Sequence, residues 1–263
     1  MKIYVINLPD SLDRRQHIKS QLDSSNMPFE FISAVDVRNL SEIEQKNLYD
    51  CEKAKLYKRE LTLGEIGCAL SHRAVYKKMI DENIDRAIIL EDDITLKPEF
   101  YNLLQYFDKL PIKRYVIKFE RLKQEIIDDN NFKCARFTPW YRMKISNEYF
   151  TGQPLYSPTL TWGYYIDLAA ARKLYSIMPK VFLVADAWWY YRKFIIIRML
   201  NKAVISTNDD QFVSTIGNRN FYANTPGIKK TFFYFLKKEI KDFIRMFLLV
   251  FEYSPTLYKK WKK

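Results

Sequence analysis

The chain is short of cysteine and glycine, and each shortage excludes a class of protein. Its 263 residues include 3 Cys (Cys51, Cys68 and Cys134), which are widely spaced and form no C-x-x-C pair. This pattern indicates neither a disulfide framework nor a zinc site, and it fits the reducing cytoplasm. Only 6 Gly stand beside 19 Tyr and 18 Phe, which excludes collagen-like repeats and flexible linkers.

Long apolar runs are also missing. No segment reaches the roughly 20 continuous apolar residues that a membrane-spanning helix needs. The apolar run at the N-terminus is too short for a signal peptide and is broken by Pro9 and Asp10. Hydrophobic residues nevertheless make up 48% of the chain, enough to bury a full core. We expect a globular protein that can meet a membrane only from its surface.

Positive charge is concentrated at the C-terminal end. Residues 229–263 hold ten basic residues against three acidic ones, so this tail carries +7 of the formal net charge of +12. A nucleic-acid-binding protein would show a similar total, but it would interleave basic and aromatic residues over one face. The concentration in one tail therefore argues against nucleic acid as a partner.

The tail has the pattern of an amphipathic helix. Its apolar side chains recur every three or four residues: Phe232, Leu236, Ile240, Phe243, Phe247 and Phe251. Such a helix can dock on the catalytic domain or lie on an anionic inner leaflet, and we favour the leaflet. We therefore predict a catalytic domain over 1–226 and a membrane-associating tail over 227–263. The predicted location is the cytoplasm of a bacterium, peripheral on the inner face of the inner membrane.

Strands and helices alternate along the rest of the chain, which predicts an α/β domain. A strand at 2–8, a helix from Ser11 and a strand at 29–35 form a βαβ unit with a parallel sheet. A helix at 65–80 precedes a strand at 86–90. Further strands are predicted at 115–119, 132–137 and 161–166. A helix is predicted at 168–178 with Asp167 as its N-cap, and irregular loops are predicted at 153–158 and 208–224.

Three carboxylates, Glu91, Asp92 and Asp93, directly follow the strand at 86–90. Adjacent carboxylates repel one another and resist desolvation, unless solvent or a cation compensates. In open α/β sheets, ligands bind at the carboxyl ends of the strands, where this cluster is expected. Hard oxygen ligands favour Mg²⁺ or Mn²⁺, which can stabilise a departing diphosphate. A solvated turn or a helix cap is the alternative interpretation.

Two other stretches belong to the same predicted edge of the sheet. The first is Asn7-Leu8-Pro9 with Asp13-Arg14-Arg15, where an arginine can hold a diphosphate with two hydrogen bonds or can simply lie in a solvated helical turn. The second is residues 64–72, in which glycines at a helix start permit close approach of a ligand and His72 is one of 2 histidines.

Three blocks of the sequence carry a resemblance to a known family: Val5-Ile6-Asn7-Leu8 with Asp13-Arg14-Arg15, residues 64–72, and Ile89-Leu90 with residues 91–93. They resemble glycosyltransferase family 25, the lipooligosaccharide (LPS) biosynthesis glycosyltransferases. The resemblance implies a GT-A-like fold, in which a Rossmann-like mixed sheet is flanked by helices. It also implies a UDP-sugar donor, Mn²⁺ (or Mg²⁺) and inverting transfer of galactose to a core oligosaccharide or lipid-linked glycan. It implies that Asp93 and Glu91 bind metal and that Glu91 and Asp92 address the donor. The donor residues it implies are Asn7, Leu8, Asp13, Arg14 and His72.

The acceptor side is predicted from the later part of the chain. Residues 161–165 resemble the family's Gly-aromatic strand, so we expect Trp162, Gly163 and Tyr164 near the acceptor, with Trp188 stacking on a sugar. Core packing is the alternative for the tryptophans. Inverting transfer needs a carboxylate base, and Asp186 is our candidate, with a helix N-cap as its alternative role. Transfer of glucose or another UDP-sugar, and a Mg²⁺-dependent nucleotidyltransferase, remain as alternative functions.

Overall fold

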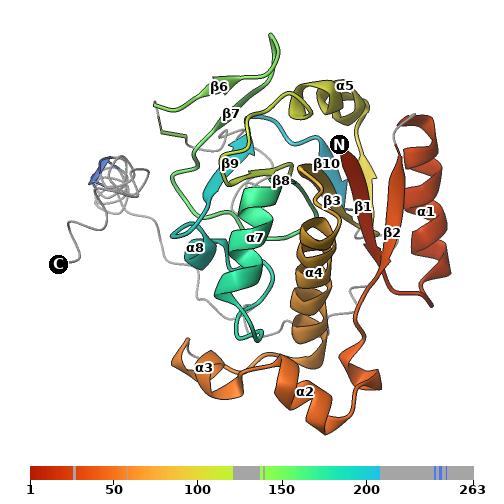
Figure 1. Cartoon of the computed structure of the whole chain (residues 1–263). Coiled ribbons are helices and arrows are strands. Elements are labelled where there is room, and N and C mark those ends of the chain that lie inside the picture. The colour runs from red at the N-terminus through yellow and green to blue at the C-terminus, as the bar shows by residue number, and fades with distance from the viewer. Residues whose placement is uncertain are drawn as a thin grey trace, which may run out of the picture.

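The computed structural model describes residues 1–25, 28–57, 59–120, 137–138 and 140–207, with residues 240, 243, 244 and 247. It is a three-layer arrangement in which one mixed sheet lies between two sets of helices (Figure 1). The eight strands follow the order β2-β1-β3-β8-β5-β9-β7-β6, and β10 pairs with β4 in a small second sheet. The predicted α/β class and Rossmann-like mixed sheet are confirmed.

The predicted N-terminal βαβ unit is present. Strand β1 (Lys2–Asn7) leads through α1 (Leu12–Leu22) and the 3-10 turn η1 (Asp23–Ser25) to β2 (Phe29–Ser33), and β2 lies parallel to β1. Helix α1 buries Ile18 and Leu22, four residues apart, against the sheet. The unit places the ends of β1 and β2 at one edge of the sheet.

The next stretch adds a third parallel strand. The 3-10 turn η2 (Val37–Asn39) and the short helices α2 (Glu42–Leu48) and α3 (Cys51–Leu56) lead into the long helix α4 (Leu63–Asp81). Helix α4 then delivers β3 (Arg86–Glu91), which pairs parallel with β1. The acidic cluster therefore lies at the C-terminal end of β3, as predicted, with Glu91 as the last residue of the strand.

Beyond β3 the sheet changes direction. Strand β4 (Ile94–Leu96) and α5 (Pro98–Phe107) precede β5 (Tyr115–Lys118), and β8 (Gly163–Asp167) inserts antiparallel between β3 and β5. Asp167 caps α7 (Leu168–Ile177) by accepting a hydrogen bond from the Ala170 amide at 2.8 Å, as predicted. The parallel pattern predicted from the first unit thus holds for β2, β1 and β3.

Strands β6 (Met143–Lys144), β7 (Phe150–Gly152) and β9 (Ile196–Leu200) complete the far side of the large sheet. Helix α8 (Trp188–Tyr191) precedes β9, and β10 (Ile205–Thr207) pairs antiparallel with β4 in the second sheet. Residues 153–158 are irregular apart from one isolated bridge, as predicted. The predicted strand at 132–137 and loop at 208–224 lie essentially outside the described residues, as do the domain boundary at 226 and most of the tail. Within the described part, no helix is long and apolar enough to cross a bilayer.

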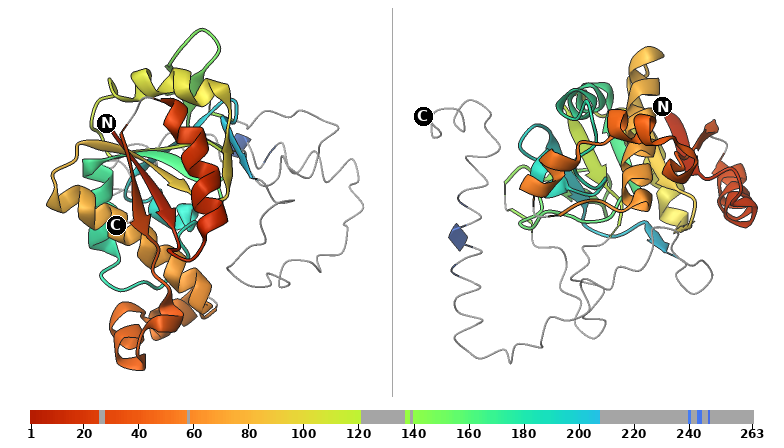
Figure 2. Two further views of the ribbon diagram at one scale, coloured as in Figure 1. Left: turned by 90° about the vertical axis from the view of Figure 1, so that its right-hand side faces the viewer. Right: turned by 90° about the horizontal axis from the view of Figure 1, so that it is seen from below.

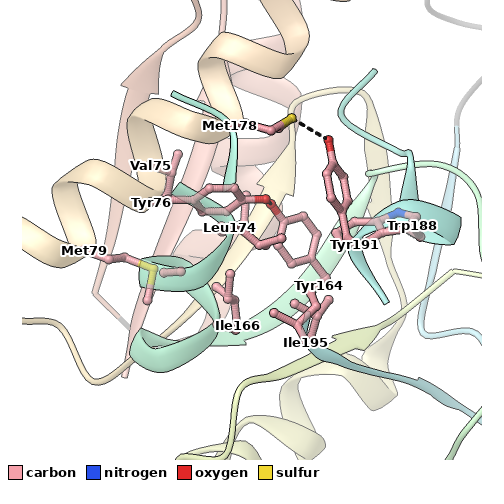
Figure 3. Close-up of a cluster of buried hydrophobic side chains, with 14 of the residues drawn as sticks. Val75, Tyr76, Met79, Tyr164, Ile166, Leu174, Met178, Trp188, Tyr191 and Ile195 are labelled. Carbon is pink, nitrogen blue, oxygen red and sulfur yellow. Dashed lines mark hydrogen bonds between the residues drawn. The ribbon is translucent and has the colours of Figure 1, made fainter. Parts of the chain in front are cut away.

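Because side chains point alternately to the two faces of the sheet, each face carries its own hydrophobic core. Tyr4, Ile89 and Tyr164 face helices α4 and α7, which pack side by side on one face of the sheet. Val5, Ile88 and their neighbours face α1 and α5 on the other (Figure 2). Figure 3 shows the first core, where the hydroxyls of Tyr76 and Tyr164 meet at 2.8 Å amid apolar side chains.

Candidate functional site

A cavity of about 160 Å³ opens at the carboxyl ends of β1 and β3. Its walls are the end of β1, the loop after β2, the first half of α4 and the turn after β3, contributed by Ile6, Leu8, Arg14, residues 34–38, Leu63, Gly64, Gly67, Cys68, Ser71, His72 and residues 91–93. This is the edge at which α/β sheets bind ligands. The structure therefore brings all three blocks of the sequence resemblance to one cavity.

Close packing of α4 against the loop after β2 shapes the cavity. Thr62 and Glu65 form a capping box at the helix start, and the Ser71 hydroxyl accepts a hydrogen bond from the Val35 amide at 2.8 Å. A Cβ at Gly67 would lie 2.5 Å from the Val35 carbonyl oxygen. Gly67 is therefore needed for this close approach.

A hydrogen-bonded network joins β1, α1 and the acidic turn. The Asn7 amide donates to Asp92 Oδ2 at 2.7 Å, and Arg15 donates to Asn7 Oδ1 at 3.3 Å. Arg14 reaches Asp92 at 3.3 Å and Asp93 at 3.2 Å. Burial raises the pKa of Asp92 although Asn7 and Arg14 oppose this effect. Arg14 is thus an integral part of the site rather than a solvated helix residue.

Asp93 has the electrostatics of a cation ligand. Its Oδ1 atom is buried and has no hydrogen-bond partner among the described residues. Burial, with the charges of Glu91 and Asp92, raises the pKa of Asp93 to about 7 although Arg14 opposes this effect. A divalent cation would satisfy the buried oxygen and hold the carboxyl group ionised. The residues present therefore fit a hard divalent metal.

Glu91 is held on the opposite side of the turn. Its Oε1 accepts a hydrogen bond from the Thr161 hydroxyl and lies 3.5 Å from His72 Nε2. Burial acts to raise the pKa of Glu91, but His72 and Thr161 outweigh it, and the pKa is lowered. His72 Nδ1 contacts the Tyr164 hydroxyl at 2.7 Å, which continues to Tyr76. The only histidine in the predicted donor motif is therefore part of a buried polar chain that ends at Glu91.

Asp186 lies in the turn before α8 and does not cap that helix. Its Oδ2 accepts a hydrogen bond from the Leu160 amide at 3.1 Å, whereas the N-cap of α8 is Ala187. Leu160 has a φ of 67°, a left-handed conformation that is rare for a leucine. The Leu160 carbonyl accepts from Lys118 Nζ at 2.9 Å and from Trp188 Nε1 at 2.7 Å. Strand β5, helix α8 and the loop that carries Asp186 thus meet at one strained residue, Leu160.

Lys118 is a fully buried cation beside this junction. It forms an ion pair with the buried Glu120 and lies 4.6 Å from the centroid of Trp188. Burial moves both groups towards their neutral forms, lowering the pKa of Lys118 and raising that of Glu120. The charges of Glu91 and Asp186 also act on Lys118. Lys118 is therefore within electrostatic reach of both Glu91 and Asp186.

The predicted acceptor residues are mostly inside the protein. Tyr164 and Trp188 are fully buried, with ring centroids 5.4 Å apart, and Gly163 is buried as well. A Cβ at Gly163 would lie 2.8 Å from Ile205. Trp162 is half-buried, and its carbonyl accepts from the Glu91 amide at 2.9 Å. Direct stacking of Tyr164 or Trp188 on a sugar would require either ring to leave the core.

The part of the chain that is similar to known proteins contains the three blocks that line the cavity. A family model described as glycosyltransferase family 25 (LPS biosynthesis protein) matches residues 1–189. The chain belongs to this family. A Haemophilus influenzae protein is 34% identical over 134 residues, covering 51% of this chain and 46% of that protein. A family 25 member of Drosophila melanogaster is 34% identical over 192 residues, and mouse procollagen galactosyltransferase 2 is 27% identical over 194.

The chain spans less than half the length of these relatives. The alignment covers 68% of this chain but 28% of the fruit-fly protein and 28% of the mouse protein. The family 25 match begins at β1 and ends within α8, so it includes both the cavity and Asp186. The family assignment therefore applies to the part of the chain that carries the site.

Several residues of this family 25 site were not among the predicted ones. Asp36 and Arg38 line the cavity from the loop after β2 and pair with each other at 2.7 Å. Thr161 and the ion pair of Lys118 with Glu120 were also missed. Asp36 directly follows the predicted second strand, so its strand-end position was a usable signal. Of the predicted donor residues, Asp13 is exposed on α1 and does not line the cavity.

Proposed function

We propose that this chain transfers galactose from UDP-galactose, with inversion, to the glycan of a lipooligosaccharide or LPS core. The observation that carries the proposal is the group of Arg14, Asp92 and Asp93 at the cavity of a family 25 chain. Relatives named procollagen galactosyltransferase support galactose as the sugar. The family model's description as an LPS biosynthesis protein supports the acceptor class.

In this proposal the donor's nucleotide and diphosphate occupy the cavity. Leu8 at the end of β1 lines the nucleotide side of the cavity, whereas Asp13, which is exposed on α1 outside the cavity, takes no part. Arg14 turns from the carboxylates to the diphosphate, for which its planar guanidinium offers two parallel hydrogen bonds. Asn7 keeps Asp92 in place during this exchange, since their 2.7 Å hydrogen bond does not depend on Arg14.

Asp93, with Glu91, holds Mn²⁺ or Mg²⁺. When bound, the cation supplies Lewis-acid stabilisation of the departing diphosphate. Asp93 is the better-supported ligand because its Oδ1 is buried without a partner among the described residues, whereas Glu91 Oε1 already contacts Thr161 and His72. His72 and Thr161 thus fix the direction in which Glu91 meets the donor.

Asp186 acts as the general base. It takes the proton of the acceptor hydroxyl as the new glycosidic bond forms and the bond to the diphosphate breaks. The Leu160 amide donates a hydrogen bond to the Asp186 carboxylate and so orients it. Trp162 and Gly163 lie on the acceptor side, while Tyr164 and Trp188 support this wall from the core.

The test is release of UDP by the purified protein with Mn²⁺ and each of several UDP-sugars, in the presence of acceptor extracts. We expect release with UDP-galactose, lost in Asp93→Ala and on addition of EDTA. Release with UDP-glucose alone would keep the enzyme class and change the sugar. Release of pyrophosphate, or no release of UDP with any donor, would reject the proposal.

We further propose that the basic tail holds the enzyme on the inner face of the bacterial inner membrane. Four described helical residues of the tail, Ile240, Phe243, Ile244 and Phe247, follow the spacing of one helix face, and each is more than half exposed. Truncation after Gly227 is expected to abolish co-sedimentation with anionic liposomes and to preserve UDP release. Undiminished co-sedimentation would refute the membrane role.

A further inference from the structure

Three different metal-binding groups meet at the inner wall of the cavity. Cys68 and His72 are four residues apart on one face of α4, and Glu91 comes from the end of β3. One ligand atom from each residue lies within 4.8 Å of the others. All three residues line the cavity, so a small cation can reach them. The sequence spacing indicated no zinc site because the third ligand comes from a strand 19 residues farther along the chain.

The histidine of this group is already oriented. His72 is 2% exposed, its Nδ1 contacts the Tyr164 hydroxyl at 2.7 Å, and its ring stacks on Tyr164 with centroids 5.7 Å apart. Nε2 consequently faces Glu91 at 3.5 Å. In metal sites, a partner on the second ring nitrogen fixes the imidazole in this way and directs the first nitrogen to the ion.

We propose that Cys68 Sγ, His72 Nε2 and a Glu91 carboxylate oxygen form a site for a borderline-soft divalent cation such as Zn²⁺ or Co²⁺. A thiolate with an imidazole selects these ions over Mg²⁺ and Mn²⁺. Metal–ligand bonds of about 2.0–2.3 Å place tetrahedral ligand atoms roughly 3.5 Å apart, so the group closes by about 1 Å. The Cys68 thiol loses its proton to solvent as the metal–sulfur bond forms, and the fourth position opens to the cavity.

The site does not include Asp93, but it shares Glu91 with the proposed Mn²⁺ or Mg²⁺ position. If Zn²⁺ holds Glu91, the donor and the hard cation lose that carboxylate, so Zn²⁺ inhibits transfer. This consequence rests on the proposed function, whereas the binding of Zn²⁺ or Co²⁺ does not. The two proposals can therefore fail independently.

The test is an optical titration of the reduced full-length protein with Co²⁺. A cobalt–thiolate bond gives a near-ultraviolet charge-transfer band, and a four-coordinate site gives intense visible bands. We expect both in the wild type and their loss on addition of Zn²⁺. Cys68→Ser is expected to lose the charge-transfer band, while Asp93→Ala keeps it. Circular dichroism establishes that each variant is folded.

A matched control uses the other two cysteines. In Cys51→Ser/Cys134→Ser, Cys68 is the only remaining thiol, and this variant is expected to keep the charge-transfer band with unchanged Co²⁺ affinity. Absence of the band in this variant, or its persistence in Cys68→Ser, would overturn the proposal. The control decides the question even if Cys68→Ser fails to fold. A retained band with no UDP release from any donor would reject the proposed function alone.

Discussion

The raised pKa of Asp93 predicts that neutralising this residue stabilises the metal-free protein at alkaline pH. Asp93 has its pKa raised from the usual 3.8 to about 7. The folded protein therefore binds a proton that the unfolded chain has released over this range, and stability falls as pH rises from about 4 to about 7. Above pH 7 the full cost of the buried charge is present. Asp93→Asn removes that cost while keeping the shape of the side chain.

The size of the effect follows from the same pKa change. Each pKa unit corresponds to 1.36 kcal/mol, which gives a ceiling of about 4 kcal/mol. The Asp93 side chain is 26% exposed, so solvent screens part of the charge, and we expect a gain of about 2 kcal/mol at pH 8. At pH 4, where the folded-state carboxyl is already protonated, the two proteins should differ little.

The assay is urea unfolding in EDTA at pH 4 and pH 8, with Asp10→Asn as a control for loss of an exposed carboxylate. Mn²⁺ at pH 8 should then reverse the order, because it stabilises the wild type and has little effect on Asp93→Asn. A variant that is less stable than the wild type in EDTA at pH 8 would refute the reasoning. So would an equal difference at both pH values.

Three other predictions concern the surrounding structure. Gly67→Ala should lower the free energy of unfolding by about 1–3 kcal/mol, because its Cβ meets the Val35 carbonyl oxygen; unchanged stability in urea would show that the loop yields. Lys118→Met should cost about 3–5 kcal/mol by leaving Glu120 without its partner, and adding Glu120→Gln should restore most of it in a double-mutant cycle. Asp186→Asn keeps an acceptor for its amide partner, so stability should hold while kcat for UDP release falls about 10²–10⁴-fold; a smaller loss would reject Asp186 as the base.

Local patterns were sufficient for the donor side of the site. Asn7, Arg14 and residues 91–93 each follow or flank a strand whose apolar run is unmistakable, and parallel strands carry their ends to one edge. The cap of α7 at Asp167 was equally readable because it depends on residues four apart at most. For these residues, the position along the chain largely determines the position in space.

The acceptor side was harder to predict because its residues interact over long sequence separations. Trp188 resembles a sugar-stacking residue in sequence, yet its ring is buried against Tyr164 and its indole nitrogen donates to Leu160. Lys118 looks like an ordinary strand residue until β8 inserts antiparallel beside β5. No periodicity signals such an insertion, since strand order depends on the packing of the whole sheet.

The sequence by itself determined the βαβ start, the family and the position of the carboxylates, because short strands, caps and strand ends are properties of neighbouring residues. Only the tertiary structure decided what each carboxylate does. Arg14 faces Asp92 and Asp93, whereas His72 and Thr161 hold Glu91, and α4 brings Cys68 beside it. Charge, burial and hydrogen bonding act through space, so three adjacent carboxylates acquire different pKa shifts and different partners.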